Sequence, residues 1–133
     1  MKVIDIEGIG PAYVKKLARA GILSVEGLLK MGANPKGRKE IAETSGIDAT
    51  LVLEWVNRAD LYRIKGVGKQ YSDLLEKAGV NTVVELSKRV PANLYKKMVE
   101  VNQAKNLVNG MPGVNQVERW IEQAKKLPRV VTY

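Results

Sequence analysis

The sequence contains no cysteine, no histidine and no phenylalanine. Without cysteine, the chain can form neither a disulfide nor a thiolate metal site. Without histidine, it lacks the most common general base, the Ser–His and Cys–His nucleophile systems and the most common ligand of transition metals. Asp and Glu are present, but they form no cluster with the spacing of metal ligands. We therefore expect no metal site, no cofactor and no enzymatic activity.

Long apolar runs are also absent, and no stretch approaches the length of a membrane span. The first residues, MKVIDIEG, are too acidic and too interrupted for a signal peptide. Hydrophobic residues still make up 45% of the chain, so Leu, Ile and Val can supply a packed core. These features predict a soluble cytoplasmic protein with no membrane partner, and we expect no small-molecule substrate.

The chain is basic, with a formal net charge of +8 and a pI near 9.7. Residues 1–63 carry ten Lys and Arg against eight Asp and Glu, whereas residues 64–133 carry twelve against six. A basic balance favours polyanionic partners, nucleic acid first. Charge that serves only solubility would give the same composition. Charge alone therefore does not decide the function.

A short glycine motif occurs twice, as IEGIG at 6–10 and as IKGVG at 64–68. The shift of 58 residues that aligns the two copies also aligns the residues that follow them. This number of coincidences at one shift indicates a duplicated unit. The aligned pairs are Ile6 with Ile64, Gly8 with Gly66, Gly10 with Gly68, Tyr13 with Tyr71, Leu17 with Leu75, Ala20 with Ala78, Gly21 with Gly79 and Val25 with Val83.

A second pair of segments, VLEWVNRA at 52–59 and VERWIEQA at 117–124, aligns at a shift of 65. The second copy therefore holds seven extra residues, which we place in the segment 106–114. Apolar residues at helical spacing, separated by Gly, Pro and Asn turns, predict about four helices in each copy. Asp48 and Asn115 are the expected N-caps of the two last helices, and Trp55 and Trp120 are expected in the core.

We thus predict an all-α fold built from two repeats, residues 1–63 and 64–133, packed as one compact helical domain. Each repeat opens with the pattern apolar-x-Gly-apolar-Gly, followed by an amphipathic helix. Glycine allows a tight turn and a close approach of a ligand to the backbone. The apolar residue between the glycines, Ile9 or Val67, can anchor the turn in the core. Exposed N–H groups and the helix dipole behind them then favour an anion.

This pattern resembles the helix-hairpin-helix motif of DNA-binding proteins. The resemblance implies that the hairpin holds nucleic acid through its phosphates without reading sequence. A dinucleotide-binding loop also begins GxG, but it needs a preceding strand, a third glycine and a downstream acid, and neither copy has them. Hairpins of this kind also occur as purely structural connections between helices, so this alternative remains open.

The residues around the two turns differ. Lys65 and Lys69 flank the second turn, whereas Asp5 and Glu7 precede the first and Pro11, which has no N–H, follows it. We therefore predict that the second turn is the main phosphate site and that the first is structural or a weaker contact. The predicted nucleic-acid-binding residues are Lys65, Gly66, Val67, Gly68, Lys69 and Gln70 in the second copy, and Gly8, Ile9, Gly10, Lys15 and Lys16 in the first.

Other basic residues are scattered along the chain, and we interpret them as solvated helix faces. They would form a groove for a nucleic-acid backbone only if several converged on the hairpin side. They are Lys36, Arg38 and Lys39; Lys88 and Arg89; Lys96 and Lys97; and Lys125 and Lys126.

The whole chain, including its ending WIEQAKKLPRVVTY at 120–133, resembles a bacterial family of unknown function, numbered 4332, which is described as helix-hairpin-helix-like. The stretch SVEGLL, with the following IKGVG, is also similar to the small N-terminal domains of recombinases and to the C-terminal domain of the bacterial RNA polymerase α subunit. Those domains bind DNA or other proteins.

Two functions therefore remain: sequence-independent, non-catalytic binding of nucleic acid, with DNA favoured, or a protein-interaction or scaffolding role. A helix-hairpin-helix glycosylase or lyase is disfavoured, because no Lys or Asp is singled out beside a base pocket.

Overall fold

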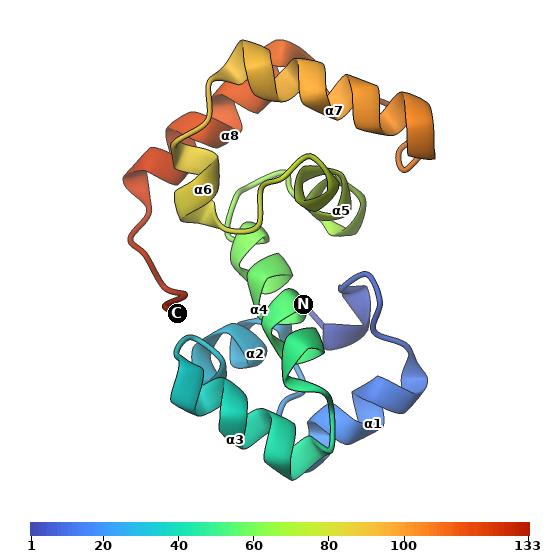
Figure 1. The fold of residues 1–133 in the computed structure, drawn as a ribbon, viewed down its shortest axis with the longest axis vertical. Coiled ribbons are helices and arrows are strands. Elements are labelled where there is room, and N and C mark those ends of the chain that lie inside the picture. The colour runs from blue at the N-terminus through green and yellow to red at the C-terminus, as the bar shows by residue number, and fades with distance from the viewer. The chain divides into compact units, whose positions relative to one another are not determined.

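The computed structural model describes all of residues 1–133 and contains eight α-helices, one short 3-10 helix and no β-strand (Figure 1). The predicted all-α class is confirmed. The chain divides into two compact units, one formed by Met1–Asp60 with Val130–Tyr133 and the other by Leu61–Arg129. The four residues at the end of the chain therefore belong to the first unit, although they follow the last helix of the second.

Three of the four α-helices of the first unit begin beside a side chain that accepts a hydrogen bond from a first-turn N–H group. Ser24 Oγ accepts a hydrogen bond from the Gly27 N–H at 2.9 Å, and Asn34 Oδ1 accepts one from the Gly37 N–H at 2.7 Å. Asp48, the predicted N-cap, accepts from the Thr50 N–H at 2.7 Å. The elements are η1 (Val3–Asp5), α1 (Pro11–Arg19), α2 (Val25–Met31), α3 (Pro35–Ser45) and α4 (Ala49–Leu61), whose last residue lies in the second unit.

The core of the first unit forms around Trp55 of α4, which is buried as predicted. The Tyr13 ring of α1 meets the Trp55 ring edge-on, with 4.9 Å between the ring centroids. Two glycines allow close packing here, Gly32 beside α4 and Gly37 beside the end of α2. A Cβ on Gly32 would lie 2.5 Å from Val56 Cγ2, and a Cβ on Gly37 would overlap the Met31 carbonyl oxygen. Because neither site has room for a side chain, these glycines are needed for packing.

The second unit consists of four helices around one apolar cluster. The helix α8 packs against both α6 and α7 (Figure 1). Trp120, Leu74, Leu75 and Met98 are among the fully buried side chains of this cluster. The elements are α5 (Lys69–Lys77), α6 (Val83–Ser87), α7 (Pro91–Lys105) and α8 (Val114–Lys126).

Two expectations about the second unit need correction. The N-cap of α8 is Gly113, and Asn115 lies inside the first turn of the helix. The extra length of this unit is also not confined to the segment 106–114. The helix α7 has 15 residues, whereas α3 has 11, and the connection 106–113 is longer than the connection 46–48.

No helix of the structure combines the length and the apolar character that a membrane crossing requires.

Candidate nucleic-acid interface

The second hairpin is a closed turn anchored by two buried side chains. Ile64 and Val67 are buried, and the Val67 N–H donates to the Ile64 carbonyl oxygen at 3.1 Å. Between them, Lys65 and Gly66 are exposed at the tip. Because its side chain is buried, Val67 can contact a ligand only through its backbone, and its role is to hold the turn.

The two glycines of this turn are required for different reasons. Gly66 has a φ of +94°, in the left-handed region that side chains disfavour. A Cβ there would also lie 3.2 Å from Trp120 Nε1 and 3.3 Å from Gln116 Nε2. Gly68, in contrast, has a φ of −112°, and a Cβ there would meet nothing within 4 Å. Gly66 therefore fixes the fold of the turn, whereas Gly68 leaves open the space in front of α5.

Gly68 is the N-cap of α5, and no side chain caps this helix. The helical hydrogen bonds begin with the Ser72 N–H, which donates to the Gly68 carbonyl oxygen at 2.8 Å. The N–H groups of a first turn have no acceptor within their own helix and carry the positive end of its dipole. A shallow hollow of about 320 Å³ lies at this end of α5, lined by Gly66, Gly68, Lys69, Gln70 and Tyr71. Its position and chemistry suit an anion.

The helix α8 holds the second hairpin in place. Gln123 Oε1 accepts from the Lys65 N–H at 2.9 Å, and Gln123 Nε2 donates to the Lys65 carbonyl oxygen at 3.4 Å. The Tyr71 ring lies against Trp120, with 5.4 Å between the centroids, and its hydroxyl donates to the Gly110 carbonyl oxygen at 3.1 Å. The sequence analysis did not predict that α8 contacts the hairpin. Helical spacing could have indicated it, since Gln116, Trp120 and Gln123 share one face of the helix.

The first hairpin has the same backbone geometry. Ile6 and Ile9 are buried, and the Ile9 N–H donates to the Ile6 carbonyl oxygen at 3.2 Å. Gly8 has a φ of +95°, and a Cβ there would lie 3.4 Å from Trp55 Nε1. Like Val67, Ile9 can offer a ligand only its backbone. The sequence match at a shift of 58 thus corresponds to a match in conformation.

The surroundings of the first hairpin are less suited to an anion. The N-cap of α1 is Gly10, and the next residue is Pro11, which has no N–H to donate. Lys15 is exposed one turn further along α1, and the Lys16 ammonium lies over the Tyr13 ring at 5.7 Å from its centroid. The structure therefore brings the predicted residues of the second copy together around the N-terminus of α5. In the first copy, Lys15 and Lys16 lie further along α1, away from the hairpin.

Arg38 does not belong to a solvated face, contrary to the prediction. It is buried, and its guanidinium donates to the carbonyl oxygens of Gly32 at 2.8 Å and Thr132 at 2.7 Å. Burial lowers the pKa of Arg38 from its usual value, and an electrostatic interaction with Tyr133 opposes this shift. Gly32 is the C-cap of α2, where a helix dipole favours a cation. Arg38 is thus a structural residue that joins α2, α3 and the end of the chain.

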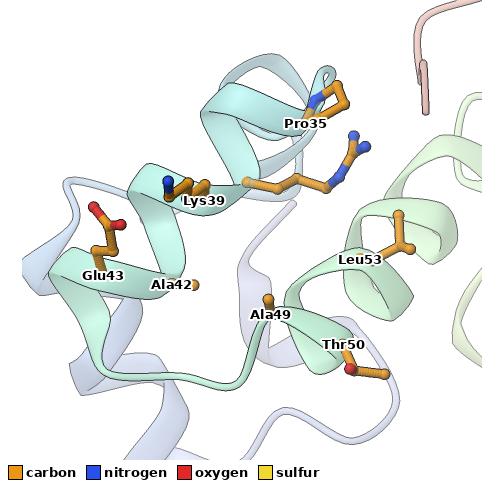
Figure 2. Close-up of a pocket in the computed structure, with 8 residues that line it drawn as sticks. Pro35, Lys39, Ala42, Glu43, Ala49, Thr50 and Leu53 are labelled. Carbon is orange, nitrogen blue, oxygen red and sulfur yellow. The ribbon is translucent and has the colours of Figure 1, made fainter.

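A second hollow, of about 410 Å³, lies between α3 and α4 in the first unit. Figure 2 shows that the small side chains of Ala42 and Ala49 leave room between the two helices, with Leu53 further along α4. No group of three or more Asp and Glu residues comes together as possible metal ligands. The residues lining the hollow are Pro35, Arg38, Lys39, Ala42, Glu43, Ala49, Thr50 and Leu53.

The sequence matches one known protein family. The family model described as "Domain of unknown function (DUF4332)" matches residues 7–127, which contain both glycine pairs. The chain belongs to this family. The DUF4332 chain also shares 44% identity over 55 residues with the poly(3-hydroxyalkanoate) polymerase subunit PhaC of Haloferax mediterranei. That match covers 41% of this chain but 10% of the polymerase subunit. No solved structure matches the chain.

Proposed function

We propose that this DUF4332 protein is a non-catalytic nucleic-acid-binding protein, with DNA favoured, that grips backbone phosphates through helix-hairpin-helix motifs. The observation that carries the proposal is the N-terminus of α5. It has no side-chain cap, it opens onto a hollow, and the exposed residues Lys65 and Lys69 flank its turn. Helix N-termini of this kind are well suited to phosphate.

The recurrence of the hairpin supports the motif assignment. Gly8 and Gly66 have φ values of +95° and +94°, and each turn places a buried apolar residue before a glycine N-cap. Backbone N–H groups and lysines recognise phosphate oxygens rather than base edges. Binding through these groups is therefore expected to be independent of sequence.

The first expected result is DNA binding that weakens steeply with salt. Two lysine–phosphate contacts at the second hairpin alone predict a slope of about −2 in a plot of log K against log salt concentration for duplex DNA, and any further contact makes the slope steeper. Fluorescence anisotropy with two labelled duplexes of unrelated sequence, measured across a salt series, would give both the slope and the sequence preference. We expect equal affinities for the two duplexes. Absence of binding at the lowest salt, or a strong preference for one duplex, would contradict the proposal.

A second candidate is a protein-interaction or scaffolding role. The curated relative is named as a polymerase subunit, and a segment similar to part of this chain makes up about a tenth of it. The hollow between α3 and α4 offers a place for a partner, because Ala42, Ala49 and Leu53 give it apolar walls and Lys39 can pair with an acidic group. A partner that combines an apolar side chain with a carboxylate would fit this site.

Two variants separate these candidates. Ala49 is exposed, so Ala49→Arg would fill the hollow between α3 and α4 without disturbing the core. Gly68→Asp would instead place a negative charge at the N-terminus of α5. If the protein is an interaction module, a stable partner will remain bound in nuclease-treated lysate to the wild type and to Gly68→Asp, and will be lost from Ala49→Arg. Loss of all bound material on nuclease treatment would exclude this role.

A further inference from the structure

We infer that Gln116 and Arg119 of α8 form a second phosphate contact beside the second hairpin, so that the ligand is a continuous polynucleotide backbone rather than a single phosphate group. This inference rests on the proposed function and extends its site from one helix end to a surface shared by α5 and α8. It adds a charged side chain that comes from a distant part of the sequence.

The geometry brings the start of α8 to the hairpin. Gln116 Nε2 lies 3.3 Å from the position that a Cβ on Gly66 would take, so the amide adjoins the rim of the hollow. The Arg119 Nη2 donates to Gln116 Oε1 at 3.4 Å. Because Arg119 is exposed, the rest of its guanidinium can donate to a phosphate next to the one at α5.

The charged residues of α8 lie on different faces of the helix. Glu118 is two residues from both Gln116 and Trp120, which places it on the opposite side of the helix from the hairpin, whereas Glu122 is three residues from Arg119 and lies beside it. Glu122 also pairs with Lys125 at 3.3 Å. Arg119, in contrast, is three residues from Gln116 and four from Gln123, so it adjoins the face that holds the turn. Arg119 is therefore the charged residue of α8 that adjoins the hairpin side, and Lys125 offsets the charge of the neighbouring Glu122.

The first unit lacks this second contact. At the shift of 65 residues, the positions of Gln116 and Arg119 are taken by Leu51 and Glu54. Glu54 pairs with Arg58, with 3.5 Å between Oε1 and Nη2. An apolar residue and an acid thus replace an amide and a base. The two copies therefore differ both in the residues beside the turns and in the helices α4 and α8 that pack behind them. Both differences favour the second hairpin as the site for a polyanion.

The test compares Arg119→Gln with Lys125→Gln. Each variant removes one positive charge from an exposed position of α8, but only Arg119 lies beside the hairpin. Salt titrations with a labelled DNA duplex should give a slope that is smaller in magnitude by about 1 for Arg119→Gln and unchanged for Lys125→Gln. Circular dichroism would establish that both variants are folded.

Several results would overturn this inference. An unchanged slope for Arg119→Gln, or an equal decrease for both variants, would show that Arg119 contributes no specific phosphate contact, while the proposed function would stand. If the wild type itself does not bind the duplex, the proposed function fails and the inference fails with it. The affinity of the wild type therefore distinguishes the two failures.

Discussion

Replacement of Gly68 by aspartate is expected to abolish DNA binding while leaving the protein as stable as the wild type or slightly more stable. Gly68 has a φ of −112° and a ψ of −158°, which any residue can adopt, and a Cβ there would meet no atom within 4 Å. Aspartate is also a preferred N-cap, because its carboxylate accepts hydrogen bonds from first-turn N–H groups. Relative to glycine, which is itself tolerated at an N-cap, it should stabilise α5 by about a few tenths of a kcal/mol.

The same carboxylate would compete directly with the ligand. It would occupy the N–H groups that we assign to phosphate, and its negative charge would repel the DNA backbone. Stability and binding should thus change in opposite directions, which mere misfolding cannot produce. Thermal unfolding and fluorescence anisotropy on the same samples would measure both quantities.

Gly10→Asp is the matched control for this experiment. Gly10 is the N-cap of α1, and a Cβ there would likewise meet nothing within 4 Å. The substitution changes the net charge by the same amount at the equivalent point of the first hairpin. Because Pro11 offers no N–H, we expect this variant to keep most of the affinity. Equal losses in the two variants would indicate a general effect of charge, and full affinity in Gly68→Asp would show that phosphate does not bind at α5.

The repeated glycine motif was sufficient to predict the local structure of the turns. Glycine beside buried aliphatic residues, followed by an amphipathic helix, has few conformational solutions, and both turns adopt the same one. The burial of Trp55 and Trp120 also followed from their equivalent places on amphipathic helices. These predictions succeeded because each depends on residues that are close together in the chain.

The contacts that complete the site depend on residues far apart in the chain, and sequence alone could not provide them. Gln123 is hydrogen-bonded to the backbone of Lys65, which lies 58 residues earlier in the chain. The Gln116 amide lies beside Gly66, although 50 residues separate them in the sequence. Periodicity shows which face of α8 is inward, but it does not show which turn that face meets. Arg38 was misjudged for the same reason, because one of the two carbonyl oxygens that its guanidinium binds belongs to Thr132, which is 94 residues further along the chain. The prediction of Asn115 as an N-cap was wrong, because α8 begins two residues earlier than predicted, directly after Gly113.

Removal of the Trp120 side chain is expected to cause the largest loss of stability. Trp120 is fully buried in the core of the second unit, where it contacts Tyr71 and lies under the hairpin at Gly66. Truncation of a buried tryptophan to alanine typically costs about 3–5 kcal/mol, a large part of the total stability of a small domain. Urea denaturation followed by circular dichroism should show Trp120→Ala unfolding at a much lower urea concentration, or not folding at all.

Trp120→Phe tests what Trp120 contributes to the hairpin. The Trp120 Nε1–H is buried and has no hydrogen-bond acceptor, so phenylalanine removes no hydrogen bond and relieves the cost of an unsatisfied donor. It keeps an aromatic ring beside Tyr71 and loses only part of the volume. We therefore expect Trp120→Phe to cost much less stability than Trp120→Ala and to retain DNA binding. Equal destabilisation by the two variants would mean that the indole N–H makes an essential interaction. If Trp120→Phe is tolerated, the shape of the buried ring is what supports the turn, and the backbone of that turn remains available for phosphate.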